Sequence, residues 1–134
     1  MLEQFEVSEI VPATPQEVYD TWLDSEGHAS MTGGGATVSA VEGVSFTAWD
    51  GYITGENLEL ERPSRIVQSW RSSEFPASAN DSRLEVVLHR VEGGTKITLR
   101  HSEIADGRGE SYKQGWVDHY LEPMKAYFGD RATD

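Results

Sequence analysis

Six short runs of alternating apolar and polar residues follow one another between residues 36 and 102, with turn residues between them. A period of two places every second side chain on the same face of a strand, so each run predicts a β-strand with one buried face. Strands joined by short turns pair as antiparallel neighbours, and this limits the middle of the chain to an antiparallel meander. The six runs are residues 37–41, 44–49, 52–61, 65–71, 83–91 and 95–102.

The chain before this meander predicts one further strand and two short helices. Residues 3–12 carry the spaced apolar side chains of a strand. Thr14-Pro15-Gln16-Glu17 has the form of a capping box with proline at the first helical position, which predicts a helix over residues 15–23. Asp24 or Ser25 is suited to cap a second short helix that runs to about Met31.

The chain after the meander predicts one long helix over about residues 110–128. An apolar side chain, usually aromatic, recurs at every fourth position and gives the helix one apolar face. Pro123 lies inside this helix and has no N–H to donate to the His119 carbonyl, so we expect a kink there. The residues of the apolar stripe are Tyr112, Trp116, Tyr120, Met124 and Phe128.

These elements predict an α+β fold, because the apolar helix face and one face of the meander must cover each other. We expect a curved antiparallel sheet of about seven strands around the long C-terminal helix, with the two short helices after the first strand. The chain has 134 residues, which suits a single domain over residues 1–134.

The charge of the chain is strongly negative and unevenly placed along it. The net charge is −12, and residues 1–61 hold 12 of the 23 acidic residues and none of the 11 Lys and Arg. Phosphate groups are bound by clustered basic side chains, so we expect neither nucleic acid nor an anionic membrane surface as a partner. We expect the acidic half to form one negative side of this acidic protein, either for solubility or for a cationic partner or ligand.

The sequence lacks the residues or motifs that several kinds of chemistry require. The chain has no cysteine, which excludes disulfides and thiol nucleophiles. It shows no signal peptide and no apolar run long enough to span a membrane, so we expect a cytoplasmic protein. His119 and Glu122 are three residues apart on the long helix, but one such pair is a weak metal signal. No nucleophile or phosphate-loop motif is present, and we expect no catalytic residue, metal or cofactor.

Several segments agree in order and spacing with one known family. They are Pro15 to Trp22, His28, Met31-Thr32-Gly33, Asp50 to Gly55, Ile66 to Arg71, Gly93 to Leu99, and Gly115-Trp116. On these residues, which cover nearly the whole chain, it resembles the activator of Hsp-90 ATPase homologue family in its C-terminal-domain type. The resemblance implies the START-like (SRPBCC, pollen-allergen-like) superfamily and its helix-grip fold, which is the architecture that the periodicity predicts.

The resemblance also implies a cavity between the sheet and the C-terminal helix, since superfamily members bind lipids, hormones or polyketides there. We expect this chain to bind a small hydrophobic or amphipathic molecule without catalysis, with His101, Tyr120 or Gln68 as polar anchors. The alternative is that these side chains only fill the core, with His101 as a core histidine. The side chains expected in the cavity are Trp22, Met31, Gln68, Trp70, Leu88, Leu99, His101, Tyr112, Trp116, Tyr120 and Met124.

Two other functions stay open at this stage. The chain can be a stress-response interaction protein with a chaperone partner, as the family resemblance implies. It can also be a small polyketide cyclase-like or hydrolase-like enzyme, as some superfamily members are. The fold alone does not choose among these functions, and the oligomeric state, monomer or homodimer, is equally open.

Overall fold

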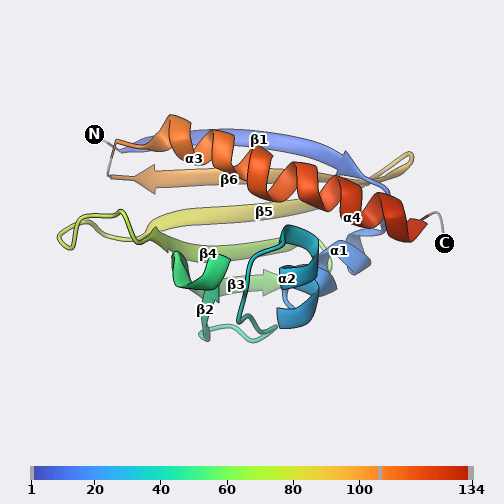
Figure 1. Ribbon diagram of the computed structural model, residues 1–134, viewed down its shortest axis with the longest axis horizontal. Coiled ribbons are helices and arrows are strands. Elements are labelled where there is room, and N and C mark those ends of the chain that lie inside the picture. The colour runs from blue at the N-terminus through green and yellow to red at the C-terminus, as the bar shows by residue number, and fades with distance from the viewer. Residues whose placement is uncertain (1, 106, 133–134) are drawn as a thin grey trace.

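The computed structural model describes residues 2–105 and 107–132, and it has one antiparallel sheet with a long helix across one face (Figure 1). The elements in chain order are β1 (Glu3–Val11), α1 (Pro15–Trp22), α2 (Ser25–Thr32), β2 (Ser45–Ala48), a short 3₁₀ turn η1 (Trp49–Gly51), β3 (Ile53–Glu61), β4 (Arg65–Ser72), β5 (Ser82–Val91), β6 (Gly94–Ile104), α3 (Gly109–Trp116), a π turn η2 (Val117–Leu121) and α4 (Glu122–Ala132).

The sheet contains six strands in the spatial order β1-β6-β5-β4-β3-β2. The strands from β2 to β6 form the meander that the alternation predicts, and β1 adds to β6 at one edge. The long helix formed by α3, η2 and α4 lies across one face, and α1 and α2 lie near its C-terminal end (Figure 1). This arrangement confirms the expected α+β helix-grip fold.

The predicted strand over residues 37–41 is wrong, which lowers the strand count from about seven to six. Only Thr37 makes a strand-like bridge, to Thr47 of β2. Further along, the carbonyls of Ser39 and Val41 accept hydrogen bonds from the side-chain amide of Asn57 at 2.9 and 3.0 Å. Because a side chain supplies these bonds, the segment satisfies its backbone without pairing as a strand.

Both short helices begin where the sequence predicts. In α1 the Thr14 hydroxyl accepts from the Glu17 N–H, and the Glu17 carboxylate accepts from the Thr14 N–H, so the capping box is complete. In α2 the cap is Asp24, whose carboxylate accepts from the Gly27 N–H at 2.8 Å. Gly33 ends α2 with a φ of 91°, a left-handed conformation that suits glycine.

The long helix accommodates Pro123 through a π turn. Over Val117–Leu121 the hydrogen bonds span five residues, and the Glu122 N–H bonds to the Val117 carbonyl. A π turn holds more residues than an α turn, and the stripe residues beyond it, Met124 and Phe128, remain in the core at 0% and 2% exposure. The kink expected at Pro123 therefore takes the form of a wider turn that directly precedes α4. Among the residues that the structure describes, no helix is long and apolar enough to cross a membrane.

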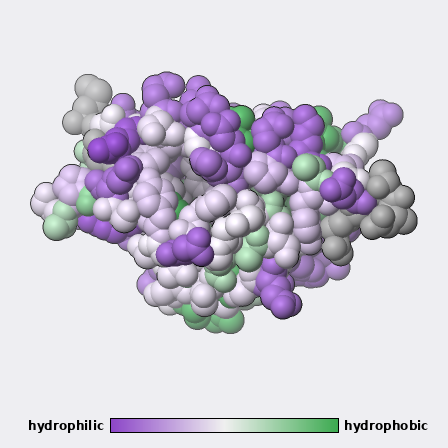
Figure 2. Space-filling view, viewed as in Figure 1, coloured by the Kyte–Doolittle hydropathy of each residue, from purple (hydrophilic) through white to green (hydrophobic). Residues whose placement is uncertain are grey.

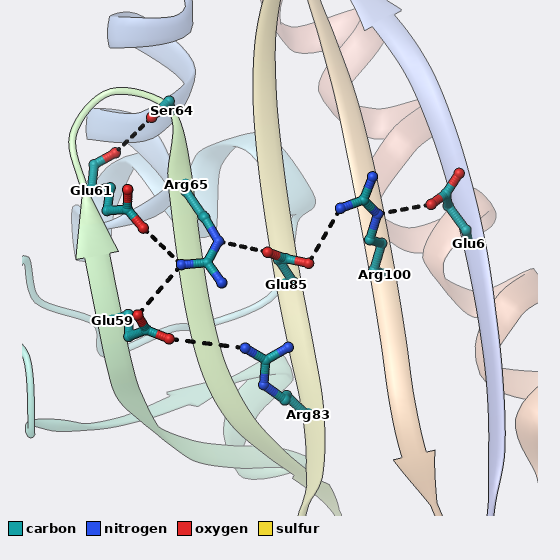
Figure 3. A network of polar contacts seen from close by, with 8 residues as sticks. All are labelled: Glu6, Glu59, Glu61, Ser64, Arg65, Arg83, Glu85 and Arg100. Atoms are coloured by element: carbon teal, nitrogen blue, oxygen red, sulfur yellow. Dashed lines mark hydrogen bonds and ion pairs between the residues drawn. The ribbon is translucent and has the colours of Figure 1, made fainter.

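The two faces of the sheet differ in chemistry. The inner face and the helices share an apolar core in which Val18, Ile66, Val86, Leu99 and Met124 are completely buried. The outer face carries a row of alternating charges across β1, β6, β5, β4 and β3 (Figure 3). The row runs from Glu6 through Arg100, Glu85 and Arg65 to Glu61 and Glu59, and Glu59 also pairs with Arg83.

The prediction of a single negative side is wrong, because the topology separates the acidic strands. β1 lies at one edge of the sheet and β2 and β3 lie at the other, with β4, β5 and β6 between them. Cations of the second half reach across to the acidic half, as in the pairs Arg100–Glu6 and Arg65–Glu61. The negative charge of residues 1–61 is therefore carried on both flanks of a central, charge-balanced part.

Candidate functional site

A pocket of about 390 Å³ lies between the N-terminal half of the long helix and the turn that joins β2 to β3. The face shown in Figure 2 is hollowed between these two walls. Six of the ten lining residues are Trp or Tyr, and the pocket is open to solvent on one side. The lining residues are Trp49, Tyr52, Ile53, Trp70, Ser111, Tyr112, Gly115, Trp116, His119 and Tyr120.

Trp49 forms the wall opposite the helix, and its backbone is held in an unusual conformation. Trp49 and Asp50 have φ angles of 50° and 58°, in the left-handed region that side chains other than glycine rarely adopt. A Cβ on Gly34 would lie 2.4 Å from the Trp49 ring, so only glycine lets the indole rest there. The turn is fixed by Gly35, whose carbonyl accepts from the Asp50 N–H at 2.9 Å. Gly34 and Gly35 therefore fix the position of Trp49, Gly34 by leaving room for its ring and Gly35 by bonding to the turn.

The helix wall consists of three aromatic side chains whose polar atoms are bonded on the core side. The Tyr112 hydroxyl lies 2.7 Å from the Ser72 hydroxyl. The Trp116 indole N–H donates to Nδ1 of His101 at 3.0 Å. The Tyr120 hydroxyl lies 2.7 Å from Nε2 of His28. Because these polar atoms have core partners, the three rings offer mainly their carbon surface to the pocket.

His28 is a buried partner of the pocket wall and is absent from the predicted site. Its Nδ1 lies 2.8 Å from the Trp22 carbonyl, which can only accept, so Nδ1 carries the proton. Nε2 then accepts from Tyr120. Burial lowers the pKa of His28 below its ordinary value of 6.5, against a smaller opposite effect of the bond to Trp22, and burial raises the pKa of Tyr120 well above 10.0.

His101 has the opposite tautomer and lies behind the wall. Nδ1 accepts from the Trp116 indole, so the ring proton is on Nε2, which lies 2.8 Å from the Ser82 hydroxyl. The Ser82 hydroxyl in turn donates to the Trp70 carbonyl at 2.8 Å. His101 is completely buried and orients Trp116, and it is not among the described residues that line the pocket.

The structure divides the predicted site residues into two groups. Trp70, Tyr112, Trp116 and Tyr120 line the pocket. The remaining seven lie in the core, each less than 6% exposed and none among the lining residues; they are Trp22, Met31, Gln68, Leu88, Leu99, His101 and Met124. The buried Gln68 side-chain amide donates to the Asn57 side-chain carbonyl at 2.8 Å, so this polar group has a hydrogen-bond partner inside the core.

Six lining residues were absent from the predicted set. Trp49 and Tyr52 flank the recognised Asp50-Gly51 turn, and their side chains enter the pocket because that turn brings β2 and β3 to its rim. Gly115 and His119 precede Pro123 on the long helix, while Ile53 and Ser111 complete the walls. The Asp50-Gly51 turn signal between Trp49 and Tyr52 could have indicated these residues. A turn motif, however, does not predict which helix or strand the turn will pack against.

The described residues show no arrangement typical of a metal site, since no cluster of three or more His, Asp or Glu side chains could hold an ion. His119 is exposed, and its ring contacts the edge of Trp49 at 5.3 Å between centroids. The polar side-chain groups of the described lining are hydroxyls, the indole N–H groups of the Trp residues and this one imidazole. The walls of the pocket are therefore mainly aromatic, and the described lining contains no Lys, Arg, Asp or Glu.

The fold and the pocket define a helix-grip protein with an aromatic cavity beside its C-terminal helix. The sequence profile described as "Activator of Hsp90 ATPase homolog 1-like protein" matches residues 12–129 of the chain. The chain therefore belongs to the activator of Hsp90 ATPase homolog 1-like family, as the motifs indicate.

Individual relatives agree with this assignment. The human "Activator of 90 kDa heat shock protein ATPase homolog 1" is 28% identical over 116 residues, which are 87% of this chain and 34% of that protein. The chain thus spans about a third of this curated relative. The crystal structure of an HSP90 activator from Plasmodium falciparum has a TM-score of 0.85 at 26% identity, covering 94% of this chain and 96% of that one. The protein CalU16 from Micromonospora echinospora, with a TM-score of 0.79, 20% identity and coverage of 98% and 80%, shares the fold.

Proposed function

We propose that the pocket binds a small hydrophobic or amphipathic molecule and that the protein acts as a non-catalytic binding module. The observation that carries this proposal is a pocket of about 390 Å³ with six Trp and Tyr rings in its walls. Ligand sites of this size are typically apolar with a few polar groups. Here Ser111 and His119 can supply those groups near the opening, while the helix aromatics keep their polar atoms bonded to the core.

The lining favours binding over catalysis. His119 is the one imidazole among the described lining residues, and its ring contacts the Trp49 ring, which cannot orient it as a base. An imidazole becomes an effective general base when a third group holds its ring and a nucleophile lies within hydrogen-bond reach. His28 has such a holding group, but its two nitrogens are already engaged by Trp22 and Tyr120.

The proposal is tested by filling the pocket at Gly115. A Cβ at Gly115 would have one neighbouring atom within 4 Å, in the His119 ring at 3.9 Å, so a Cβ fits without a clash, and the rest of a larger side chain would occupy the pocket that Gly115 lines. Gly115→Leu should abolish binding of a neutral apolar probe such as Nile red. It should not destabilise the protein, because leucine is a better helix former than glycine by about 0.8 kcal/mol.

Gly129→Leu is the matched control, because Gly129 also lies in the long helix and a Cβ there would have no neighbouring atom within 4 Å. It is not among the lining residues, so this variant should bind the probe like the parent protein. Equal probe binding by the Gly115→Leu variant, or no probe binding by the parent, would refute the proposed pocket function.

A second function is favoured by the relatives. The solved Plasmodium protein, which is described as an HSP90 activator, matches this chain over almost all of both lengths. We propose that this chain also contacts a chaperone of the 90-kDa heat-shock class in the cytoplasm, as part of a stress response. Its acidic flanks would meet basic surface on the chaperone, so the complex should be strongest at low salt. Co-purification at low and at physiological salt tests this, and no complex at either would count against it.

A further inference from the structure

The pocket walls hold many π faces and no formal charge. Its described lining includes the rings of Trp49, Trp70, Trp116, Tyr52, Tyr112 and Tyr120, but no Lys, Arg, Asp or Glu. The face of an aromatic ring carries partial negative charge and attracts cations, with Trp the strongest of the three ring types. Three of the protein's four Trp residues line this one pocket, so the walls offer an unusual density of such faces.

Most polar atoms of the aromatic walls already have partners; the exception among the described lining residues is the buried indole N–H of Trp49, which has no hydrogen-bond partner. The polar atoms of Tyr112, Trp116 and Tyr120 are bonded to Ser72, His101 and His28. At the rim, the Tyr52 hydroxyl donates to the Glu74 carboxylate at 2.9 Å. A ligand inside the pocket is therefore recognised chiefly by ring faces and by its shape. A group that needs several strong hydrogen bonds, such as a carboxylate or phosphate, would lose its hydration without replacement.

The charge around the pocket disfavours anions as well. The whole chain carries a net charge of −12, and the wall formed by Trp49, Tyr52 and Ile53 belongs to the half that contains no Lys or Arg. Arg108 is a nearby cation, and it lies 3.7 Å from Glu74, whose carboxylate offsets its charge. A negative surrounding potential concentrates cations near the opening and repels anions.

We propose that the ligand class of this pocket is an organic cation, an alkylated ammonium group carried on an apolar body. This inference rests on the proposed ligand-binding function and names the chemistry of its ligand. The ammonium group is held against the aromatic faces, with Trp49 as the wall nearest the turn and Trp116 on the helix. The apolar body fills the remaining volume against Trp70 and Ile53.

Three probes of nearly the same shape isolate the charge. Choline carries a quaternary ammonium head, 3,3-dimethylbutan-1-ol has carbon in place of the nitrogen and is neutral, and 3,3-dimethylbutanoate is an anion with the same branched head. Binding is followed through the indole N–H signals of the Trp side chains by NMR titration. Choline should bind at least about tenfold more tightly than the neutral isostere, and the anion more weakly than both. The signals of Trp49, Trp70 and Trp116 should shift more than that of Trp22, which lies in the core.

Two substitutions at Trp49 test the ring face itself. Trp49→Leu keeps an apolar wall without a π system, so it should lower choline affinity several-fold and leave the neutral isostere less affected. Trp49→Phe keeps an aromatic face and should retain more of the preference for the cation. Both variants replace a residue with a φ of 50° by another side chain with a Cβ, so they share the backbone strain of the parent.

The outcomes separate this inference from the proposed function. Equal or tighter binding of the neutral isostere would overturn the cation inference, and so would the absence of any choline binding. If a neutral probe such as Nile red still binds and Gly115→Leu still abolishes that binding, the pocket function stands with a neutral ligand. If no probe of any charge binds the parent protein, both the inference and the proposed function fail.

Discussion

Tyr120 belongs to the pocket with its ring and to the core with its hydroxyl. Its Oη lies 2.7 Å from Nε2 of His28, and that nitrogen is buried and acts as an acceptor. Tyr120→Phe removes the donor and leaves His28 with an unsatisfied atom, so we expect a loss of about 1 to 3 kcal/mol in the free energy of unfolding. Urea denaturation measures this loss.

Tyr52→Phe serves as the comparison for Tyr120→Phe. The Tyr52 hydroxyl donates to the Glu74 carboxylate on an exposed side chain, where water can replace it. We expect its loss to change the free energy of unfolding by less than about 0.5 kcal/mol. Equal effects of the two substitutions would show that the bond between Tyr120 and His28 contributes nothing beyond a surface contact.

His28 should make stability depend on pH. Burial lowers its pKa in the folded state below the ordinary 6.5, so between these two values the unfolded chain binds more protons. Its contribution is therefore complete above about pH 6.5 and declines as the pH falls below that value, by at most about 1.4 kcal/mol per pH unit.

His28→Gln removes this titration, so the stability difference between the parent and this variant should narrow as the solution is acidified from neutral pH. The comparison cancels the other titrating groups, which both proteins share. If the variant does not fold, NMR titration of the His28 ring in the parent gives the same information. Parallel pH curves, or a ring that titrates at its ordinary pKa, would contradict the expectation.

At the scale of elements, Glu85 of β5 links this strand to its two neighbours through ion pairs with two arginines. On the outer face it accepts from Arg65 of β4 and from Arg100 of β6, and its side chain is 14% exposed (Figure 3). The hydrogen bond from Arg65 is the main reason that the pKa of Glu85 lies below its ordinary value of 4.5. Its contribution is thus present above about pH 4.5 and is lost as the pH falls through the lowered pKa.

We expect Glu85→Gln to lower the free energy of unfolding by about 1 to 2 kcal/mol at neutral pH, less than for a fully buried pair because water reaches this face. Thermal or urea denaturation measures the loss, which should shrink in acid and in high salt. Glu6→Gln is the control, since Glu6 pairs with one exposed arginine at the end of the same row. If Glu6→Gln lowered the free energy of unfolding more than Glu85→Gln, burial of Glu85 would not be what makes its ion pairs stabilising.

Most elements were predictable because their signals are local. Alternation gives five of the six central strands, and the capping box gives the start of α1. Residues 37–41 show the same alternation, but their carbonyls are satisfied by Asn57, which is distant in sequence and leaves no periodic trace. The π turn over Val117–Leu121 is another such case, since the four-residue apolar stripe continues through it to the buried Met124 and Phe128 and so does not reveal it.

The pocket was only partly predictable for the same reason. The stripe on the long helix placed Tyr112, Trp116 and Tyr120 together, and all three line the pocket. The opposite wall depends on Trp49 resting against Gly34, a contact between two segments whose side-by-side position is set by the tertiary fold. Likewise, no sequence spacing indicates that His28 meets Tyr120 across 92 positions.

At the scale of the whole molecule, the net charge of −12 must be held in a compact volume. The ion pairs between the two halves of the chain, such as Arg62–Asp20 and Lys125–Glu9, offset this charge locally but leave both flanks acidic. Salt screens the attraction within these exposed pairs, each of which contributes little, and it also screens the repulsion among all the unpaired acidic groups. For a charge of this size the repulsion is the larger effect, because it grows with the square of the net charge.

We therefore expect added salt to stabilise the protein at neutral pH. A charged-sphere comparison of the folded and unfolded chain gives a gain on the order of 3 kcal/mol between about 10 mM and about 150 mM salt. This gain corresponds to a rise of several degrees in the melting temperature of a domain of this length. NaCl and KCl should act alike, because screening depends on ionic strength and not on the identity of the cation. A melting temperature that falls with salt would mean that the ion pairs on the outer face and between the two halves outweigh the repulsion of the acidic flanks.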